Sequence, residues 1–446
     1  MQKNKLRHLM PQLREVWRLS LPAILTQITT IAMQYIDSAM VGRLGANASA
    51  AIGLVASSTW LFNGVCYALS AGFSVQAAHR IGAGLDREAR CVERHGLLAA
   101  AVVSAFLCAL GIAIHKALPV WLGGGAEITQ DAGRYFLMFS CMLPFTQICS
   151  LTSSFLQCAG DMLSPSILNA VMCVLDVIFN AIFIPRLGVL GAGLGTTLAC
   201  AVVSVLILYQ CAGKNPILRL RREMREWKPE IFKKALRIGT PVAVQEVAMC
   251  GAQVVSTAII APLGAVAVAA NAFAVTAESI CYMPGYGIAS AAAALVGRFV
   301  GAGDMENAKR YGDLCTGLGA ALMAGTGAVM ILVCPMVFRM LTPVLEVQEL
   351  AARVLRIELL AEPLFGVSIV AAGVLRGAGD TLVPSLLSLG SIWIVRIGLA
   401  LLLVGPLGLR GMWIAMAVEL CVRGLLLLAR QRTSRFYARA VAPERP

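Results

Sequence analysis

The chain has 446 residues, of which 58% are hydrophobic and 14% are charged, and its mean hydropathy is +0.78. Because soluble proteins carry roughly 25% charged residues, this composition excludes an ordinary soluble globular protein. The formal net charge of +13 does not indicate nucleic-acid binding, since the basic residues recur in alternate gaps between apolar segments instead of gathering in one domain. We expect no nucleic-acid partner.

Twelve apolar segments recur along the chain, each long enough for the roughly 20 residues with which a helix crosses a bilayer. The sequence therefore predicts an all-α polytopic membrane protein of twelve transmembrane helices. The first segment is interpreted as a span and not as a cleavable signal peptide, because many similar segments follow it. The predicted spans cover residues 18–41, 50–75, 94–115, 133–156, 164–185, 189–211, 238–260, 267–294, 312–336, 350–374, 384–405 and 409–429.

The distribution of Lys and Arg predicts the orientation of these spans, because cytoplasmic loops are rich in both. The N-terminal segment, the gap after the second span, the central gap and the C-terminal tail are all basic, whereas the gap APLGAVAV has no charge. Both termini and the central gap are therefore predicted to be cytoplasmic. The segment KNPILRLRREMREWKPE, residues 214–230, is predicted to lie on the anionic inner leaflet as an anchor.

The sequence lacks the signatures of an enzyme or a metalloprotein. Its fourteen cysteines include no Cys-X-X-Cys pair and no Cys/His cluster with metal-ligand spacing. The Gly-rich segment GAGD lacks the Lys-Ser/Thr that a P-loop requires, and no nucleophile–base set is present. We predict no catalytic residues, no metal site and no bound cofactor.

An internal repeat relates the two halves of the chain. A shift of 219 positions aligns Pro22 with Pro241, RLGA with PLGA, and CAGDMLSPSIL with GAGDTLVPSLL. After a slippage of one residue, GVLG at Gly188 aligns with GLRG at Gly408. Because each copy has an even number of spans, both copies share one orientation. Parallel repeats of this kind are typical of transporters.

The repeat predicts two six-helix lobes joined by a linker. The N-lobe is assigned to residues 1–213, the basic cytoplasmic linker to 214–237, and the C-lobe with its basic tail to 238–446. A channel is disfavoured, because two duplicated lobes suggest alternating access.

Several segments resemble signatures of the multidrug and toxic compound extrusion (MATE) transporters. The segment DSAMVGRLGANASAAIG resembles the family's first span, and NAVMCVLDVIFNAIFI its fifth. Two further segments, MPGYGIASAAAALVGRFVGAGDMENAKR and VLRGAGDTLVPS, resemble its eighth span and the loop after its tenth. The resemblance covers essentially the whole chain, and it is closest to the bacterial DinF-like branch.

This resemblance implies a secondary transporter of the bacterial inner membrane, with two lobes that alternate between outward- and inward-facing states. Its members export organic cations and other amphipathic compounds in exchange for protons or sodium ions. The partners expected here are small amphipathic organic cations and membrane lipids, and the protein is expected to be a monomer. The alternative is a flippase for lipid-linked precursors, in the same superfamily. A flippase is expected to have a cationic central cavity, whereas the N-lobe cavity is predicted to be acidic.

The candidate coupling residues of the N-lobe begin with Asp37, the only charge between Arg18 and Arg43. A carboxylate within a span is costly, by about 2.5 to 3.5 kcal/mol on insertion scales, and is therefore a candidate functional group. The resemblance places Asp37 near Asp176 and Asn180, whose spacing of four puts both on one helix face. Two carboxyls facing one another cannot both ionise cheaply, so one is expected to hold a proton. A static hydrogen-bonded network is the competing interpretation. Thr196 is a supporting candidate.

The C-lobe contains further charges within predicted spans, Glu246, Glu278 and Arg396. Each is a candidate for cation coupling or substrate binding. Glu278 and Arg396 resemble residues of the same type in part of the family, and an ion pair between them is the static alternative. For Glu246, a position near the cytoplasmic interface is the competing interpretation.

The NorM-like branch forms its sodium site with a Glu and an Asp, and the positions in register here are Met249 and Phe365. Neither side chain binds a cation through oxygen, although Glu246 and Glu362 lie one turn away and could substitute. We therefore expect coupling to the proton gradient, with sodium as the alternative.

Overall fold

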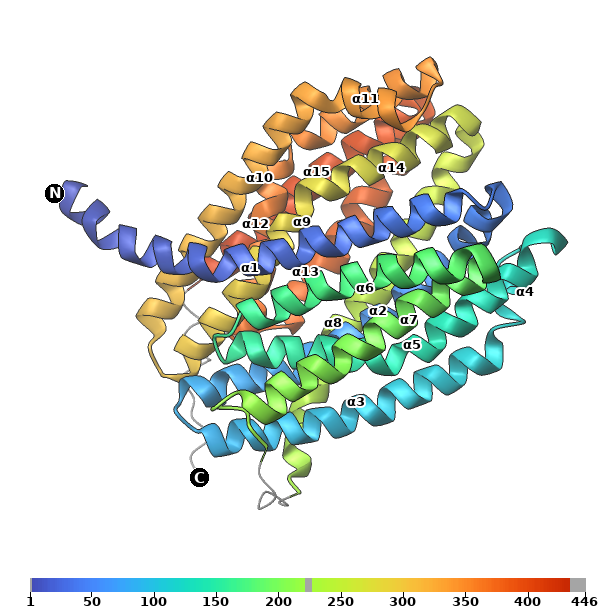
Figure 1. Ribbon diagram of the computed structural model, residues 1–446. Coiled ribbons are helices and arrows are strands. Elements are labelled where there is room, and N and C mark those ends of the chain that lie inside the picture. The colour runs from blue at the N-terminus through green and yellow to red at the C-terminus, as the bar shows by residue number, and fades with distance from the viewer. Residues whose placement is uncertain (1, 221–226, 434–446) are drawn as a thin grey trace. The chain divides into compact units, whose positions relative to one another are not determined.

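The computed structural model describes residues 2–220 and 227–433, and all regular elements within these residues are helices (Figure 1). This confirms the predicted all-α fold. The helices are α1 (Gln2–Gly42), α2 (Ala46–Gly82), α3 (Asp86–Ile114), α4 (Leu118–Trp121), α5 (Ala126–Cys158), α6 (Leu163–Leu187), α7 (Val189–Leu208), η1 (Tyr209–Lys214), α8 (Pro229–Ile260), η2 (Ala261–Leu263), α9 (Ala265–Gly301), α10 (Met305–Leu341), α11 (Leu345–Leu359), α12 (Glu362–Gly377), α13 (Leu382–Gly390), η3 (Ser391–Ile397), α14 (Gly398–Leu407) and α15 (Leu409–Arg432).

Among the described residues, eleven helical segments are long and apolar enough to cross a membrane. The bent pair of α11 and α12 brings the number of spans to twelve if the pair crosses the membrane as one span. These segments correspond to the twelve predicted spans, and the third helix ends at Ile114, one residue before the predicted end of its span. The protein is therefore a multi-pass membrane protein. The tenth span is not straight, because α11 and α12 meet at an angle of 57°. Pro363 lies in the first turn of α12 and has no backbone N–H to continue the hydrogen bonds of α11.

The chain forms two compact units, whose borders lie within α1 and α8. The N-terminal unit is Ile28–Glu246, and the C-terminal unit combines Met1–Gln27 with Val247–Pro446. Gln27 and Glu246, the last residues before the borders, are equivalent under the shift of 219. The predicted lobes, 1–213 and 238–446, are defined by the repeat and not by packing, so they stay a prediction.

Close backbone contacts at glycine explain why α1 and α8 are divided. In the N-terminal unit, a Cβ atom on Gly72 of α2 would lie 2.5 Å from the carbonyl oxygen of Ala235 of α8. In the C-terminal unit, a Cβ atom on Gly287 of α9 would lie 2.6 Å from Cα of Ile24 of α1. Only glycine permits helices to approach this closely. The first half of each repeat's opening helix therefore packs against the second helix of the other repeat.

The repeat is also present in the backbone conformation. Gly45 and Gly264, which precede α2 and α9, have φ angles of 112° and 95°. Gly188 and Gly408, which precede α7 and α15, have φ angles of 60° and 58°. Residues with a Cβ atom rarely adopt such angles, so glycine is required at both members of each pair.

A π-helix explains the slippage in the repeat. The helix Leu163–Leu187 has 25 residues, whereas the corresponding span Leu382–Leu407 has 26 and contains the π-helix η3, Ser391–Ile397. A π-helical turn accommodates one more residue than an α-helical turn, and π-helices are frequent at functional sites. Beyond η3 the shift is therefore 220, and it pairs Gly191 with Gly411, which make the same contact with the preceding helix.

The central linker, which belongs to the N-terminal unit, contacts α2 and α3 through main-chain carbonyls. Arg90 of α3 donates a hydrogen bond to the carbonyl oxygen of Ile217 (3.1 Å), and Gln76 of α2 donates to that of Ile231 (3.1 Å). Residues 221–226 of the linker and 434–446 of the basic tail lie outside the described residues. The anchoring of the linker on the inner leaflet therefore stays a prediction.

Candidate functional site

The N-terminal unit brings Asp37, Asp176 and Asn180 together. Asp37 lies in the second half of α1, while Asp176 and Asn180 lie one turn apart on α6 and are completely buried. The side-chain amide of Asn180 donates to Asp37 Oδ1 at 2.8 Å and to Asp176 Oδ2 at 3.2 Å. The two carboxyls therefore face the same amide, in the geometry that the spacing of four predicts.

Two acceptors of this cluster are unsatisfied by the described residues. Asp176 Oδ1 and Asn180 Oδ1 are buried and have no hydrogen-bond partner there. Burying an acceptor without a donor costs about 1 to 3 kcal/mol, so a proton or a bound cation would stabilise the cluster. A Cβ atom on Gly195 of α7 would overlap Asn180 Oδ1, so the glycine leaves room for the amide.

Tyr135 is a further member of this site that the sequence did not reveal. It lies on α5, close enough to interact electrostatically with both Asp37 and Asp176. Its position depends on the packing of α5 against α7, where a Cβ atom on Gly193 would lie 2.7 Å from Cβ of Met138 and 3.7 Å from the Tyr135 ring. No local motif marks such a residue, because it is distant in sequence from both carboxyls.

Two other candidates do not form hydrogen bonds to this cluster. Thr196 Oγ1 donates to the carbonyl oxygen of Ala192, one turn earlier in α7, at 3.1 Å. Glu246 lies at the end of the N-terminal unit. A Cβ atom on Gly64 of α2 would lie 2.8 Å from the Cβ atom of Glu246. The close approach of the two helices explains why glycine faces Glu246.

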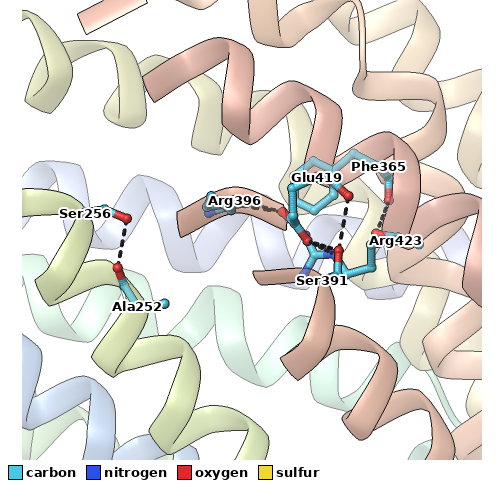
Figure 2. A network of polar contacts seen from close by, with 8 residues as sticks. Ala252, Ser256, Phe365, Ser391, Arg396, Glu419 and Arg423 are labelled. Carbon is cyan, nitrogen blue, oxygen red and sulfur yellow. Dashed lines mark hydrogen bonds and ion pairs between the residues drawn. The ribbon is translucent and has the colours of Figure 1, made fainter. Parts of the chain in front are cut away.

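The C-terminal unit contains a charged network around Glu419 of α15 (Figure 2). The completely buried carboxylate accepts two hydrogen bonds from Arg396 of η3, from Nε at 3.1 Å and from Nη2 at 2.6 Å. Ser391 Oγ donates to Glu419 Oε1 at 2.8 Å, and Arg423 Nε lies 3.1 Å from the same oxygen. The Glu419 carboxylate is thus paired with two guanidinium groups.

The ion pair between Arg396 and Glu278, the static alternative for these two residues, is not formed among the described residues. Among the described residues, the salt bridge of Arg396 is with Glu419, one helix further along the chain. Glu278 of α9 is buried and interacts electrostatically with Arg396 and Arg423, without a salt bridge to either. Glu419 and Arg423 were not predicted from the sequence, although their positions within the last span are a signal that identifies such residues.

Two more carboxyls lie near Glu278. Glu358 of α11 and Glu362 of α12 are completely buried, and neither carboxyl has a hydrogen-bond partner among the described residues. Glu358 interacts electrostatically with both Glu278 and Glu362. Of these three, Glu358 was missed by the sequence analysis.

The positions that correspond to the NorM-like sodium ligands contain no oxygen ligand. Phe365 packs against Tyr282, with ring centroids 5.5 Å apart, and the Arg423 guanidinium lies 5.6 Å from its ring centre. No group of three or more His, Cys, Asp or Glu side chains among the described residues has a geometry suited to a metal ion.

The fold and these sites define a polytopic helical membrane protein of two repeats, with a buried charged cluster in each compact unit. The MatE family matches residues 22–182 and 241–402. The probable multidrug resistance protein NorM of Thermotoga maritima is 27% identical over 443 residues, which cover 97% of this chain and 95% of that protein. The NorM protein of Pseudomonas aeruginosa is 30% identical over 460 residues, covering 97% and 92%. A MOP superfamily transporter from Pyrococcus furiosus has a TM-score of 0.91 at 21% identity, with 96% of each chain covered.

The chain therefore belongs to the MatE family, the MATE transporters, as its sequence motifs predict. Its assignment to the DinF-like branch stays a prediction.

Proposed function

We propose that this protein is a secondary multidrug exporter, which moves amphipathic organic cations out of the cell by alternating access. The family assignment supports this proposal, and so do two relatives that are both named probable multidrug resistance protein NorM. These names do not favour a flippase for lipid-linked precursors. They also support a transporter and not an enzyme.

The observation that carries the proposed mechanism is the position of Asn180 between two carboxyls. Its amide donates to Asp37 and Asp176, and the other oxygen of Asp176 has no partner among the described residues. Two facing carboxyls are stabilised when one positive charge lies between them. Without substrate that charge is a bound proton, and with substrate it is the substrate cation. We assign proton–cation exchange to this cluster, with Glu246, Glu278 and Arg396 as the secondary candidates.

The basic cytoplasmic gaps support an orientation with both termini inside, in the bacterial inner membrane. The same charges would bind anionic lipids. We propose that a monomer performs transport and that the proton gradient drives it without a cofactor. A potential of about 100 mV supplies about 2.3 kcal/mol per charge moved.

The test uses purified protein in liposomes loaded with ethidium, to which a pH jump is applied with and without sodium. The expected result is ethidium movement driven by pH alone, and its loss in Asp37→Asn. Ser38→Ala is the matched control, because among the described residues Ser38 Oγ donates only to the carbonyl oxygen of Gln34 of its own helix, at 2.8 Å. Movement that requires sodium would transfer coupling to Glu246 or Glu278. No movement under either gradient would overturn the export function.

A further inference from the structure

The linker segment 209–220, which comprises η1 and the first described residues of the central linker, is packed as an ordered element. Asn215 Oδ1 accepts hydrogen bonds from the backbone N–H groups of Ile217 at 3.0 Å and of Leu218 at 3.2 Å. Cys211 and Leu218 are completely buried. The segment is therefore docked on the N-terminal unit through side chains as well as through main-chain carbonyls.

Glu93 of α3 lies against this segment. Its side chain is completely buried, and the Cys211 thiol donates a hydrogen bond to its Oε1 at 3.2 Å. The other oxygen, Oε2, is also buried and has no hydrogen-bond partner among the described residues. One weak thiol donor stabilises a buried carboxylate poorly, because the lost hydration of the charge is not replaced. We therefore expect Glu93 to hold a proton while the segment is docked.

The charged and titratable groups around Glu93 come from α3, from η1 and from the chain at the end of α5. Arg90 interacts electrostatically with Glu93 and favours its ionised form. Within the described residues it forms no salt bridge to Glu93, and its guanidinium donates to a linker carbonyl. Cys158 and Asp161 interact electrostatically with Cys211. The negative charge of Asp161 disfavours a second negative charge beside the thiol.

The internal repeat shows that the fold does not require this carboxyl. The shift of 219 pairs Glu93 with Gly312 of α10, and the shift of 220 pairs Cys211 with Gln431 of α15. A Cβ atom on Gly312 would lie 3.6 Å from Gln431 Nε2, so the two helices meet in the same way there. Gln431 forms its hydrogen bonds to other residues of α10. The buried carboxyl is therefore particular to the unit that contains the linker.

We propose that Glu93 is a sensor of cytoplasmic pH, which keeps the linker segment 209–220 docked on α3 while it is protonated and releases the segment when it ionises. In the released state water solvates the carboxylate, so release gives up one proton. A rise in pH therefore favours release, by up to about tenfold per pH unit for one proton. The proposed exchange at Asp37 carries protons into the cytoplasm, so the sensor responds to a pH that transport itself lowers. The assignment to cytoplasmic pH rests on the proposed function and orientation, whereas the release does not.

His95, two residues further along α3, responds to pH with the opposite sign. Its Nε2 accepts a hydrogen bond from the backbone N–H of Lys228, so protonation of the ring by acid breaks that bond. Acid therefore loosens the linker at Lys228, whereas alkali releases the segment 209–220. The direction of the pH dependence and the part of the linker that responds distinguish the two groups.

Hydrogen–deuterium exchange of the purified full chain in detergent tests the proposal without a gradient or a substrate. The protection factor of a peptide is the exchange rate of an unstructured chain divided by the measured rate at the same pH. For peptides within residues 209–220 it should fall by up to about tenfold per unit between about pH 6 and 8, because a solvated glutamate is ionised there. In Glu93→Gln, which does not titrate, the fall should be less than about twofold over the whole range.

Glu88→Gln is the matched control, because Glu88 lies on the same helix but pairs with Arg80 where the two side chains are 41% and 40% exposed. It should retain the wild-type pH dependence. Peptides from residues 305–316 of α10 are the internal reference, and their protection should not follow that of the linker. An equal fall in this reference would mean that the whole protein opens, and would overturn the proposal.

A fall that persists in Glu93→Gln would assign the pH dependence to another group and would also overturn the proposal. If this variant does not fold, the wild-type measurement still decides, since protection of residues 209–220 that is independent of pH contradicts a carboxyl that ionises on release. The exchange measurement contains no transport step, so its failure leaves the proposed export function intact. Absence of ethidium movement in liposomes would overturn the export function and not the pH-dependent release.

Discussion

Asn180 Nδ2 lies 2.8 Å from Asp37 Oδ1, and this hydrogen bond joins α6 to the second half of α1. The same nitrogen donates to Asp176, so the amide holds two acidic groups in one place. A proton or a cationic substrate that leaves this site changes the repulsion between the carboxyls. The bond therefore couples occupancy of the site to the packing of two membrane helices.

The first prediction concerns proton release on substrate binding. Because a cation neutralises the charge that a proton neutralises in the empty site, adding ethidium to weakly buffered, purified protein at neutral pH should release about one proton per bound ethidium. A pH-sensitive dye measures the release. Asp176→Asn should abolish it, because a single carboxyl then remains to bind the cation. Unchanged release in Asp176→Asn would place the exchanged proton at another group.

The second prediction concerns the amide itself. In Asn180→Ala, both carboxyls lose a donor, and we expect a loss of about 1 to 3 kcal/mol of folding free energy. Thermal unfolding in detergent, followed by protein fluorescence, measures this as a lower melting temperature. Thr196→Ala is the control, since Thr196 bonds only to a carbonyl of its own helix in the described residues and should cost less than about 0.5 kcal/mol. Equal melting temperatures for the two variants would contradict the bridging role.

The acidic site of the N-terminal unit was largely predictable from the sequence. A lone Asp37 in an apolar segment is conspicuous, and the spacing of Asp176 and Asn180 places both on one face of a helix. Tyr135 was not predictable, because its position near the carboxyls depends on how α5 packs against α7. A tyrosine that is placed by contacts between helices has no local sequence motif that would identify it.

In the C-terminal unit, the charged residues were visible but their partners were not. Spans eight and eleven each contain a conspicuous charge, Glu278 and Arg396, and an ion pair between them was the static alternative to a functional role. The π-helix η3 accommodates one residue more than the equivalent helix and changes the direction of the residues around it. Arg396 bonds to Glu419 instead. The slippage in the repeat was the sequence signal of this π-helix.

The twelve spans were predictable because a bilayer requires long apolar helices. The borders of the compact units were not, because the division of α1 and α8 results from glycine contacts such as Gly72 with Ala235 and Gly287 with Ile24. A repeat in the sequence shows which segments are equivalent, but not which of them pack together.

The third prediction concerns the buried network. Glu419→Gln removes the carboxylate that forms salt bridges with both Arg396 and Arg423, which should cost about 3 to 5 kcal/mol. The melting temperature in detergent and the yield of folded protein measure the effect. Glu349→Gln is the matched control, because Glu349 pairs with Arg353 on an exposed helix face and should change stability by about 0.5 kcal/mol or less. A loss for Glu419→Gln as small as the control would show that the guanidinium groups find other partners.

The fourth prediction concerns His95 of α3, which contacts the central linker. Its Nδ1 lies 2.7 Å from the carbonyl oxygen of Cys91, and its Nε2 accepts a hydrogen bond from the backbone N–H of Lys228 at 3.1 Å. Because Nδ1 must donate to a carbonyl, the ring carries its proton there. His95→Phe keeps the ring but removes the acceptor for Lys228, so the backbone amide hydrogen of Lys228 should exchange with solvent faster, by about fivefold for a loss of 1 kcal/mol. His115, whose Nδ1 lies 2.6 Å from the carbonyl oxygen of Ile112, provides the control His115→Phe, and equal exchange rates at Lys228 in the two variants would exclude a role of His95 in holding the linker.

The last prediction concerns Asp304, which caps the N-terminus of α10. Its side chain accepts hydrogen bonds from the backbone N–H of Asn307 at 3.1 Å and from the Asn307 amide at 2.7 Å. These bonds lower the pKa of Asp304 below its ordinary value of 3.8, the backbone bond having the larger effect. Because the pKa is lowered in the folded state, the cap stabilises the protein fully at neutral pH, and this stabilisation is lost as the pH falls through the lowered pKa.

Asp304→Ala should therefore lower the melting temperature at pH 7, and the difference from wild type should shrink as the pH is brought below about 4. Asp304→Asn retains an N-cap acceptor, the amide oxygen, which does not titrate. Its own capping should therefore persist at all pH values, and the difference between its melting temperature and that of wild type should depend on pH. The equivalent helix α3 has Leu85 at its N-cap and no side-chain hydrogen bond there, so Leu85→Asp should raise the melting temperature at pH 7. A deficit of Asp304→Ala that persists unchanged at low pH would mean that Asp304 stabilises α10 through packing and not through its charge.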